Sequence, residues 1–319
     1  MKKSLFLLAL MSALLWTGCE QPIEPEEITG RPEEKTPESL TLTIQAVKAD
    51  APETKGLDLG FGGSQDTTSR LKSIWKAGEN VYVYNGTTYI CTLTLGQDGN
   101  VIDENDAHKA TLQFTLLTEQ LSGNSATLTL LTPRETRSYE GQTGVLFYDS
   151  NASPDNSIEK NFHYTKATVE VTLSNDVVTV SAASFQNQQS IYRLSFRYGA
   201  STPTPISTKS VTIAAANSGL VQNWSLDGTT GPVTGAIEVK RASADENPFF
   251  VALRNSNTGE EAFTFTVIDN NGVTYRGGKT IPAEVNVNGR FISIKNATLS
   301  DRLDVPLNTS AEAAVGTAL

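Results

Sequence analysis

The sequence predicts an all-β protein that is built from two tandem antiparallel β-sandwiches. Short runs of alternating apolar and polar residues lie between turn residues, and a helical period is absent except for a short turn at 116–121. The length of 319 residues exceeds that of one ordinary sandwich and suits two domains. We place the N-terminal sandwich at residues 39–187 and the C-terminal sandwich at residues 188–299.

The strands expected in the first half are short and are bounded by Gly, Asn, Asp or Pro. Leu40, Leu42 and Ile44 alternate with polar residues, which is typical of a strand that buries one face. Asn85-Gly86 and Asn175-Asp176 predict tight hairpin turns. The expected strands cover 39–47, 81–84, 87–93, 110–117, 126–131, 144–148, 167–173 and 177–183.

The second half repeats this pattern with a second set of strands. Asn270-Asn271-Gly272 predicts a further tight turn. The expected strands cover 191–198, 207–214, 235–240, 249–254, 262–268, 273–276 and 290–296. Residues 300–319 form a tail that is either a spare strand or a loose terminus.

The N-terminus has the three parts of a secretory signal. Lys2 and Lys3 precede an apolar run at 5–16, and Thr17-Gly18-Cys19 follows. The segment 15–19 resembles a bacterial lipobox, which implies that residues 1–18 are removed and that Cys19 is acylated. The resemblance implies a lipid anchor, and the alternative is an ordinary signal peptide followed by a chance cysteine.

Residues 19–38 are predicted to be a lipidated linker, since they are rich in Glu and Pro and poor in apolar residues. The formal net charge of the chain is −10, which argues against nucleic acid as a partner. No later stretch approaches the roughly 18 consecutive apolar residues of a membrane span. We therefore expect the lipid, or protein partners, to hold the chain at a membrane.

Residues that carry catalytic chemistry are sparse. His108 lies in the polar run 103–109, which lacks the Gly and terminal Glu of an EF-hand, so we expect a solvated hairpin loop rather than a calcium site. His163 is expected in a strand, and Cys91 is expected to be a small buried residue rather than a reactive thiol. There is neither a Gly-x-Ser-x-Gly elbow nor a phosphate-binding loop. We expect no enzyme, no cofactor and no metal site; a hydrolase with two carboxylates set by the fold is the least favoured alternative.

Several segments resemble the fimbrillin family. Thr54-Lys55 is similar to a Thr-Arg or Thr-Lys pair near the head of those chains, and the segment 75–84 (WKAGENVYVY) resembles their Trp-x-x-Gly-Asp-x-Ile-x-Val motif. The segments 249–254, 262–268 and 289–294 resemble their closing strands. Glu79 stands where Asp is usual, and Arg290-Phe291 replaces the usual pair. The resemblance runs over most of the chain from Cys19 to Leu299.

The resemblance implies a subunit of a cell-surface pilus with two transthyretin-like sandwiches, exported as a lipoprotein to the outer membrane. It implies a trypsin-like protease that removes the first strand, so that the terminal strand of another subunit inserts in its place. In this chain the cut would follow Lys55 or Arg70. The donor would be the tail, with Leu303, Val305 and Leu307 as inward plugs, although Pro306 removes one ladder hydrogen bond.

The alternative function is that of a surface lipoprotein that binds glycans. Trp75 and Trp224 are the tryptophans that could stack on a sugar, and a core position is the favoured interpretation of each. No group of aromatic residues with the spacing of a binding platform is evident. The pilus subunit is therefore the favoured prediction.

Overall fold

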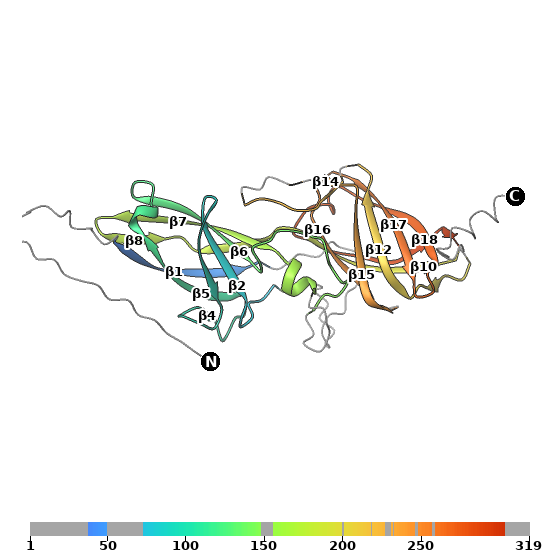
Figure 1. Ribbon diagram of the computed structural model, residues 1–319, viewed down its shortest axis with the longest axis horizontal. Coiled ribbons are helices and arrows are strands. Elements are labelled where there is room, and N and C mark those ends of the chain that lie inside the picture. The colour runs from blue at the N-terminus through green and yellow to red at the C-terminus, as the bar shows by residue number, and fades with distance from the viewer. Residues whose placement is uncertain are drawn as a thin grey trace, which may run out of the picture. The chain divides into compact units, whose positions relative to one another are not determined.

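The computed structural model shows a chain that is built almost entirely of β-strands (Figure 1). The residues that it describes are 38–49, 73–147, 156–199, 201–217, 219–226, 231, 233–245, 248–256 and 259–303. These residues belong to one packed unit. The predicted all-β class is confirmed.

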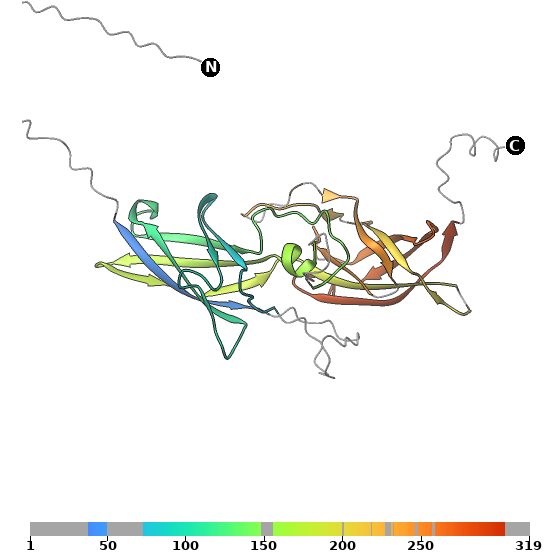
Figure 2. The same cartoon turned by 60° about the horizontal axis from the view of Figure 1, so that its bottom comes forward.

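One large sheet is formed by strands from residues 39–187. Along the sheet the strands are β3 (Thr88–Thr94), β2 (Asn80–Asn85), β6 (Ser125–Thr132), β7 (Thr165–Ser174), β9 (Ala183–Asn187), β1 (Ser39–Lys48), β5 (Lys109–Leu117) and β4 (Val101–Ile102), and β8 (Val177–Val180) pairs with β7. The sheet folds over a core that receives Ile44 from β1, Leu112 from β5 and Val169 from β7. This packing makes the first group of strands a sandwich (Figure 2).

The remaining strands form smaller sheets. A four-stranded sheet contains β11 (Thr204–Pro205), β10 (Ser190–Tyr198), β16 (Phe249–Leu253) and β19 (Phe291–Leu299). A five-stranded sheet contains β15 (Ala236–Asp245), β12 (Thr208–Ala215), β17 (Glu261–Asp269), β18 (Thr274–Ile281) and β20 (Asp301–Leu303), and β13 (Leu220–Val221) pairs with β14 (Val233–Thr234). The ring of Tyr192, from the four-stranded sheet, meets the ring of Phe263, from the five-stranded sheet, edge to face at 5.5 Å.

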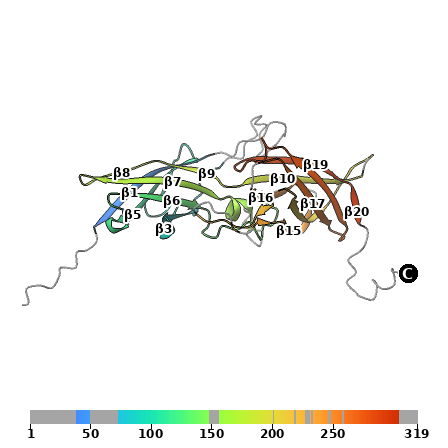
Figure 3. The same cartoon turned by 90° about the horizontal axis from the view of Figure 1, so that it is seen from above.

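Two strand pairs run parallel, so the expectation of purely antiparallel sandwiches is wrong in this detail. The last three residues of β1 pair with the start of β9, and β10 pairs with β19 along most of its length (Figure 3). A parallel pair joins strands that are far apart in the sequence. Local patterns such as turn residues therefore carry no signal for it.

The two groups of strands share side-chain contacts. Tyr139 and Tyr164 belong to the same buried cluster as Trp224 and Phe249. Gln142 donates to the carbonyl of Ala252 at 2.8 Å and accepts from its N–H at 2.7 Å. The predicted boundary at 187/188 lies between β9 and β10, and the division into two domains stays a prediction.

Most predicted strands and turns match the structure, and one strand does not. Asn175 and Asp176 both adopt positive φ angles, 49° and 62°, as a two-residue hairpin turn requires. The strand expected at 144–148 is wrong: described residues 144–147 form no strand. Instead, the carbonyls of Val145 and Leu146 accept from the first N–H groups of the π-helix η2 (Ile158–Phe162). The short turn expected at 116–121 is the 3-10 helix η1 (Thr118–Gln120).

Candidate functional site

The first strand, β1, buries one of its faces from Leu42 onward. Leu42, Ile44 and Ala46 are at most 1% exposed. The residues between them, Thr43 and Gln45, face solvent. This alternation is the one read from the sequence, and it fixes the strand in a single register.

β1 pairs with one neighbouring strand along nearly its whole length and with the other only at its end. On one side β1 pairs antiparallel with β5 from Ser39, opposite Leu117, to Val47, opposite Lys109. On the other side it pairs with β9 only at its last three residues. We call the edge of β5 at 109–117, together with residues 183–185 of β9, the β1 seat.

Lys48, the last residue of β1, points into the protein in the same direction as the apolar stripe. Its Nζ lies 2.5 Å from Oε1 of Glu79, and the two side chains are 5% and 15% exposed. The same Oε1 accepts from the hydroxyl of the buried Thr132 at 2.6 Å. Oε2 accepts from the backbone N–H of Lys76 at 3.3 Å. Both carboxylate oxygens of Glu79 are therefore engaged.

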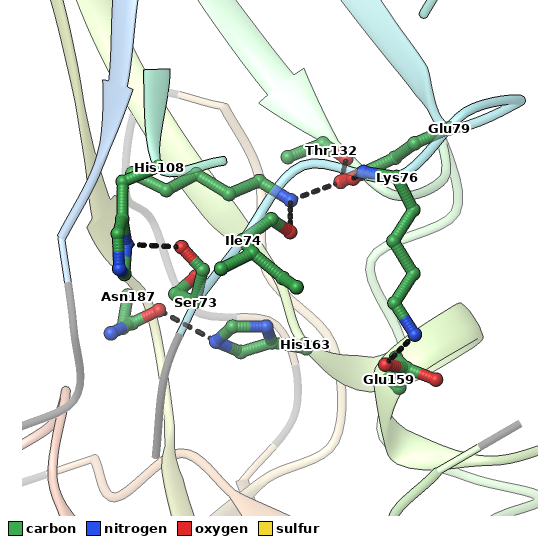
Figure 4. A network of polar contacts seen from close by, with 10 residues as sticks. Ser73, Ile74, Lys76, Glu79, His108, Thr132, Glu159, His163 and Asn187 are labelled. Carbon is green, nitrogen blue, oxygen red and sulfur yellow. Dashed lines mark hydrogen bonds and ion pairs between the residues drawn. The ribbon is translucent and has the colours of Figure 1, made fainter. Parts of the chain in front are cut away.

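Two further groups face the Lys48 ammonium. It donates to the carbonyl oxygen of Ile74 at 3.2 Å. It also lies 4.2 Å from the centroid of the Trp75 ring, a distance that suits a cation–π interaction. We call the Ile74 carbonyl, the Trp75 ring and the Glu79 carboxylate the cation seat. Figure 4 shows the hydrogen bonds to Ile74 and Glu79.

Burial lowers the pKa of Lys48 below its ordinary value, and the nearby Glu79 carboxylate opposes this shift. Desolvation penalises a charged group, while an opposite charge in contact favours it. The charge on Lys48 thus depends on Glu79.

The end of β1 is also fixed through its backbone. The N–H of Lys48 donates to the carbonyl of His108 at 2.9 Å, and the N–H of Ala49 donates to that of Phe185 at 3.1 Å. The Asn187 amide donates to the carbonyl of Ala49 at 3.3 Å. The Asn187 side-chain oxygen lies 2.7 Å from Nε2 of His163.

His163 lies directly after η2, before β7, so the expectation that it belongs to a strand is wrong. Burial, with a smaller contribution from Lys48, lowers its pKa to about 4. The ring is therefore neutral at pH 7, and with its proton on Nε2 it donates to Asn187. This arrangement orients Asn187 and does not resemble a catalytic base beside a nucleophile.

The chain returns to the end of β1 at Ser73. The N–H of Trp75 donates to the carbonyl of Ala107 at 2.8 Å, and Nδ1 of His108 lies 3.0 Å from the carbonyl oxygen of Ser73. Lys48 and Ile74 are themselves joined by a hydrogen bond. Residues 73–75, which follow the segment 50–72 outside the described residues, therefore lie against the end of β1, which precedes that segment.

A cavity of about 530 Å³ adjoins this place. Residues of both charges line it, including Lys48, Lys76, Glu79, Arg134 and Glu159. Lys76 forms an ion pair with Glu159 of η2. Within the described ranges, no group of three or more His, Cys, Asp and Glu is placed to bind a metal ion.

Three carboxylate oxygens of the polar loop at 103–109 have partners within the loop. Asp103 Oδ1 accepts from the N–H groups of Asn105 and Asp106 at 2.8 and 3.2 Å. Asp106 pairs with Lys109 at 2.9 Å and accepts from the N–H of His108 at 3.1 Å. The segment is a hairpin loop between β4 and β5, as expected from the sequence.

Trp75 and Trp224 are 2% and 3% exposed, which confirms the prediction that both lie in the core. Neither ring presents a face on which a sugar could stack. Cys91 in β3 is half-buried, and burial raises its pKa to about 11. Its thiol is therefore a weak nucleophile at neutral pH.

Several predicted functional residues lie outside the described residues: Cys19, Lys55, Arg70, Val305 and Leu307. Leu303 ends β20, where it is the partner of Thr274 in β18 of the same chain. No helix in the described ranges is long and apolar enough to cross a bilayer.

The contacts of Lys48 were not predicted from the sequence, because the first strand was expected to end at Val47. The alternation that places residues 42, 44 and 46 inward also places residue 48 inward. A lysine at such a position requires an acidic partner. That signal points to an interaction of Lys48 but does not identify Glu79.

No family model matches this chain, and no curated protein matches it. Among solved structures, a crystal structure of a "putative cell adhesion protein" from Bacteroides fragilis is similar to it, with 10% sequence identity and a TM-score of 0.37. The similarity covers 82% of this chain and 96% of that chain. What this chain does is therefore inferred from the geometry of β1 and its surroundings.

Proposed function

We propose that this protein is a fimbrillin-like structural subunit of a cell-surface pilus, which assembles by strand exchange and supports adhesion. In this proposal the lipid on Cys19 holds the chain at the outer membrane. A trypsin-like protease then hydrolyses the peptide bond after Lys55 or Arg70. The released N-terminal piece includes β1, and a strand of another subunit takes its place.

The placement of β1 is the observation that carries the proposal. β1 is the first strand of the described chain and supplies three buried apolar side chains, those of Leu42, Ile44 and Ala46. Its antiparallel partner β5 follows it by sixty residues in the sequence, so the body of the sheet keeps β5 when β1 leaves. The Lys48 ammonium donates to the Ile74 carbonyl, so this contact between residues on either side of the segment 50–72 does not depend on an intact backbone within it.

The physics of strand exchange fits this geometry. Loss of β1 exposes the row of N–H and C=O groups along β5 and the apolar floor beneath Leu42 and Ile44. Each of these two side chains contributes about 1.5–3 kcal/mol by burial. An incoming strand with the same alternation restores both the hydrogen bonds and the burial. Until the cut, β1 itself blocks the seat.

The donor in this proposal is the tail, with Leu303, Val305 and Leu307 as plugs in the groove of a neighbouring subunit. Asp301–Leu303 pairs with Thr274–Arg276 of β18, at the edge of the five-stranded sheet. The tail therefore starts from a sheet edge.

A limited digestion tests the proposal. The full mature chain, with Cys19→Ser to prevent lipidation, is cut with trypsin and analysed by size exclusion, N-terminal sequencing and unboiled SDS gels. We expect a new N-terminus after Lys55 or Arg70 and a ladder of SDS-resistant multimers. The matched control carries Lys55→Gln, Arg70→Gln and Lys72→Gln, which removes every tryptic site of the segment 50–72, so it keeps β1 and stays monomeric. A cut chain that loses β1 and remains monomeric would contradict the proposal and favour the glycan-binding lipoprotein.

A further inference from the structure

Glu79 belongs to the body of the protein, whereas its cationic partner belongs to the strand that is proposed to leave. Glu79 directly precedes β2, and its backbone carbonyl accepts from the N–H of Leu95 at 2.9 Å. Lys48 lies in β1. Removal of β1 therefore takes away the ammonium group and leaves the carboxylate.

The groups around the Glu79 carboxylate favour a positive charge at the position of the Lys48 ammonium. All three groups of the cation seat lie within residues 74–79, outside β1, and each presents negative charge or electron density. The nearby Lys76 ammonium pairs with Glu159. Trp75 is itself held edge to face against Phe185 of β9 at 5.0 Å. The seat thus stays assembled on the body when β1 is absent.

A strand that enters without a cation would bury the Glu79 carboxylate without its charge partner. An unpaired charge at a buried position is strongly unfavourable, whereas a neutral or apolar pair at the same place is tolerated. The cation seat therefore discriminates among strands that satisfy the β1 seat equally well with apolar side chains.

We propose that the cation seat is a specificity site that selects a donor strand with a lysine in phase with its inward apolar residues, at the position of Lys48. This inference rests on the proposed function. In sequence terms, the donor carries apolar residues at alternate positions and a lysine two residues after the last of them. Such a strand reproduces the order Leu42, Ile44, Ala46 and Lys48.

In this proposal the preferred donor strand comes from a different protein subunit, not from a second copy of this chain. The segment 304–319 of this chain contains no lysine or arginine, so it lacks the required cation in every register. The basic residue just before it, Arg302, lies in β20 and neighbours the inward plug position Leu303, so it falls on the opposite face of the strand. The tail of a second copy is therefore the weaker occupant: it fills the seat of the purified, cut chain when no other donor is present, and a strand with the lysine displaces it.

Peptide exchange into the cut chain tests the selection. The Cys19→Ser chain is cut as above, and fluorescent peptides are added and measured by anisotropy and native gels. The reference peptide has the sequence of residues 38–49. One variant carries Lys48→Met, and a second exchanges Val47 and Lys48, so that composition is unchanged but the lysine faces outward. A fourth peptide has the sequence of residues 303–314.

We expect the reference peptide to bind at least about tenfold more tightly than the Lys48→Met peptide and the exchanged peptide. The tail peptide is expected to bind as weakly as they do. On a body carrying Glu79→Gln, the preference for the reference peptide over the Lys48→Met peptide is expected to disappear. The peptide comparison on the unaltered body needs no variant protein to fold.

The outcomes separate the two proposals. If no peptide enters the cut chain, strand exchange itself fails, and the specificity site fails with it. If the reference and Lys48→Met peptides bind equally well, exchange stands and the specificity site is wrong. If the tail peptide binds as tightly as the reference, the commitment to a different subunit is overturned, and a second copy is the partner.

Discussion

The ammonium of Lys48 lies 2.5 Å from the Glu79 carboxylate, and the segment that we expect a protease to cut separates the two residues in the sequence. The contact joins the end of the first strand to the residues that precede β2. This ion pair does not depend on the backbone between the two residues, so it still links β1 to the rest of the chain after that backbone is cut. Its strength affects both the stability of the uncut chain and the release of β1.

Lys48→Met is expected to destabilise the uncut chain by about 3 kcal/mol, because it leaves the Glu79 carboxylate buried without its cation. The double variant Lys48→Met/Glu79→Gln removes both charges and is expected to recover most of this loss. Urea unfolding followed by tryptophan fluorescence measures both variants. If the Lys48→Met variant is as stable as the parent, the Glu79 carboxylate is solvated by water and does not need the Lys48 ammonium.

The Ile44 side chain is expected to contribute much more to stability than its neighbour Thr43. Ile44 is 1% exposed in the core, whereas Thr43 faces solvent in the same strand. Ile44→Ala should therefore lower the free energy of unfolding by about 2–5 kcal/mol, and Thr43→Ala should change it by less than about 0.5 kcal/mol. Similar losses for the two variants would show that β1 is held through its backbone alone.

Local signals in the sequence predict most of the strands. Asn85-Gly86 predicts the hairpin between β2 and β3, and Gly86 adopts the positive φ of 60° that this turn needs. The parallel pairing of β1 with β9 was not predicted, because a contact between residues 46 and 183 has no local pattern. The strand predicted at 144–148 is wrong, because the carbonyls of Gly144, Val145 and Leu146 accept hydrogen bonds from Phe250 and from η2 and form no strand ladder.

The site was predicted only in part for a similar reason. The sequence identified β1 as a strand with a buried face and the segment 75–84 as a motif, but it did not connect them. Their connection is a side-chain contact across 31 residues, between Lys48 and Glu79. Such a contact depends on the register of β1 against β5 and β9, which only the folded sheet defines.

The stability of the chain is expected to fall as the pH decreases from about 6.5 to about 4, in part because of His163. Its pKa is lowered in the folded state, so the unfolded chain binds the proton first and is favoured by acid. The contribution is complete above pH 6.5 and is lost as the pH falls through 4. Because His163 as a whole residue is only half-buried, we expect about 2 kcal/mol over this window.

His163→Gln provides the control for this effect. Glutamine does not titrate and can still donate to Asn187, which holds the carbonyl of Ala49. The difference in unfolding free energy between parent and variant should therefore change with pH only between 4 and 6.5. A difference that is constant with pH would assign His163 a packing role alone.

A disulfide between β1 and β5 is expected to prevent assembly without preventing cleavage. Thr41 and Thr115 are direct partners in the antiparallel pair, and both face solvent. Opposite residues of such a pair have Cα atoms about 4.5–5.5 Å apart, which is within the range of a disulfide. The chain with Thr41→Cys and Thr115→Cys, oxidised and then cut with trypsin, should retain β1 and remain monomeric on size exclusion. Adding a reductant to the same sample should release β1 and restore the multimers.

Cys91 should not compete for the new cysteines, because its pKa is raised to about 11. Multimers formed by the oxidised, cut chain would show that subunits associate through a surface other than the β1 seat.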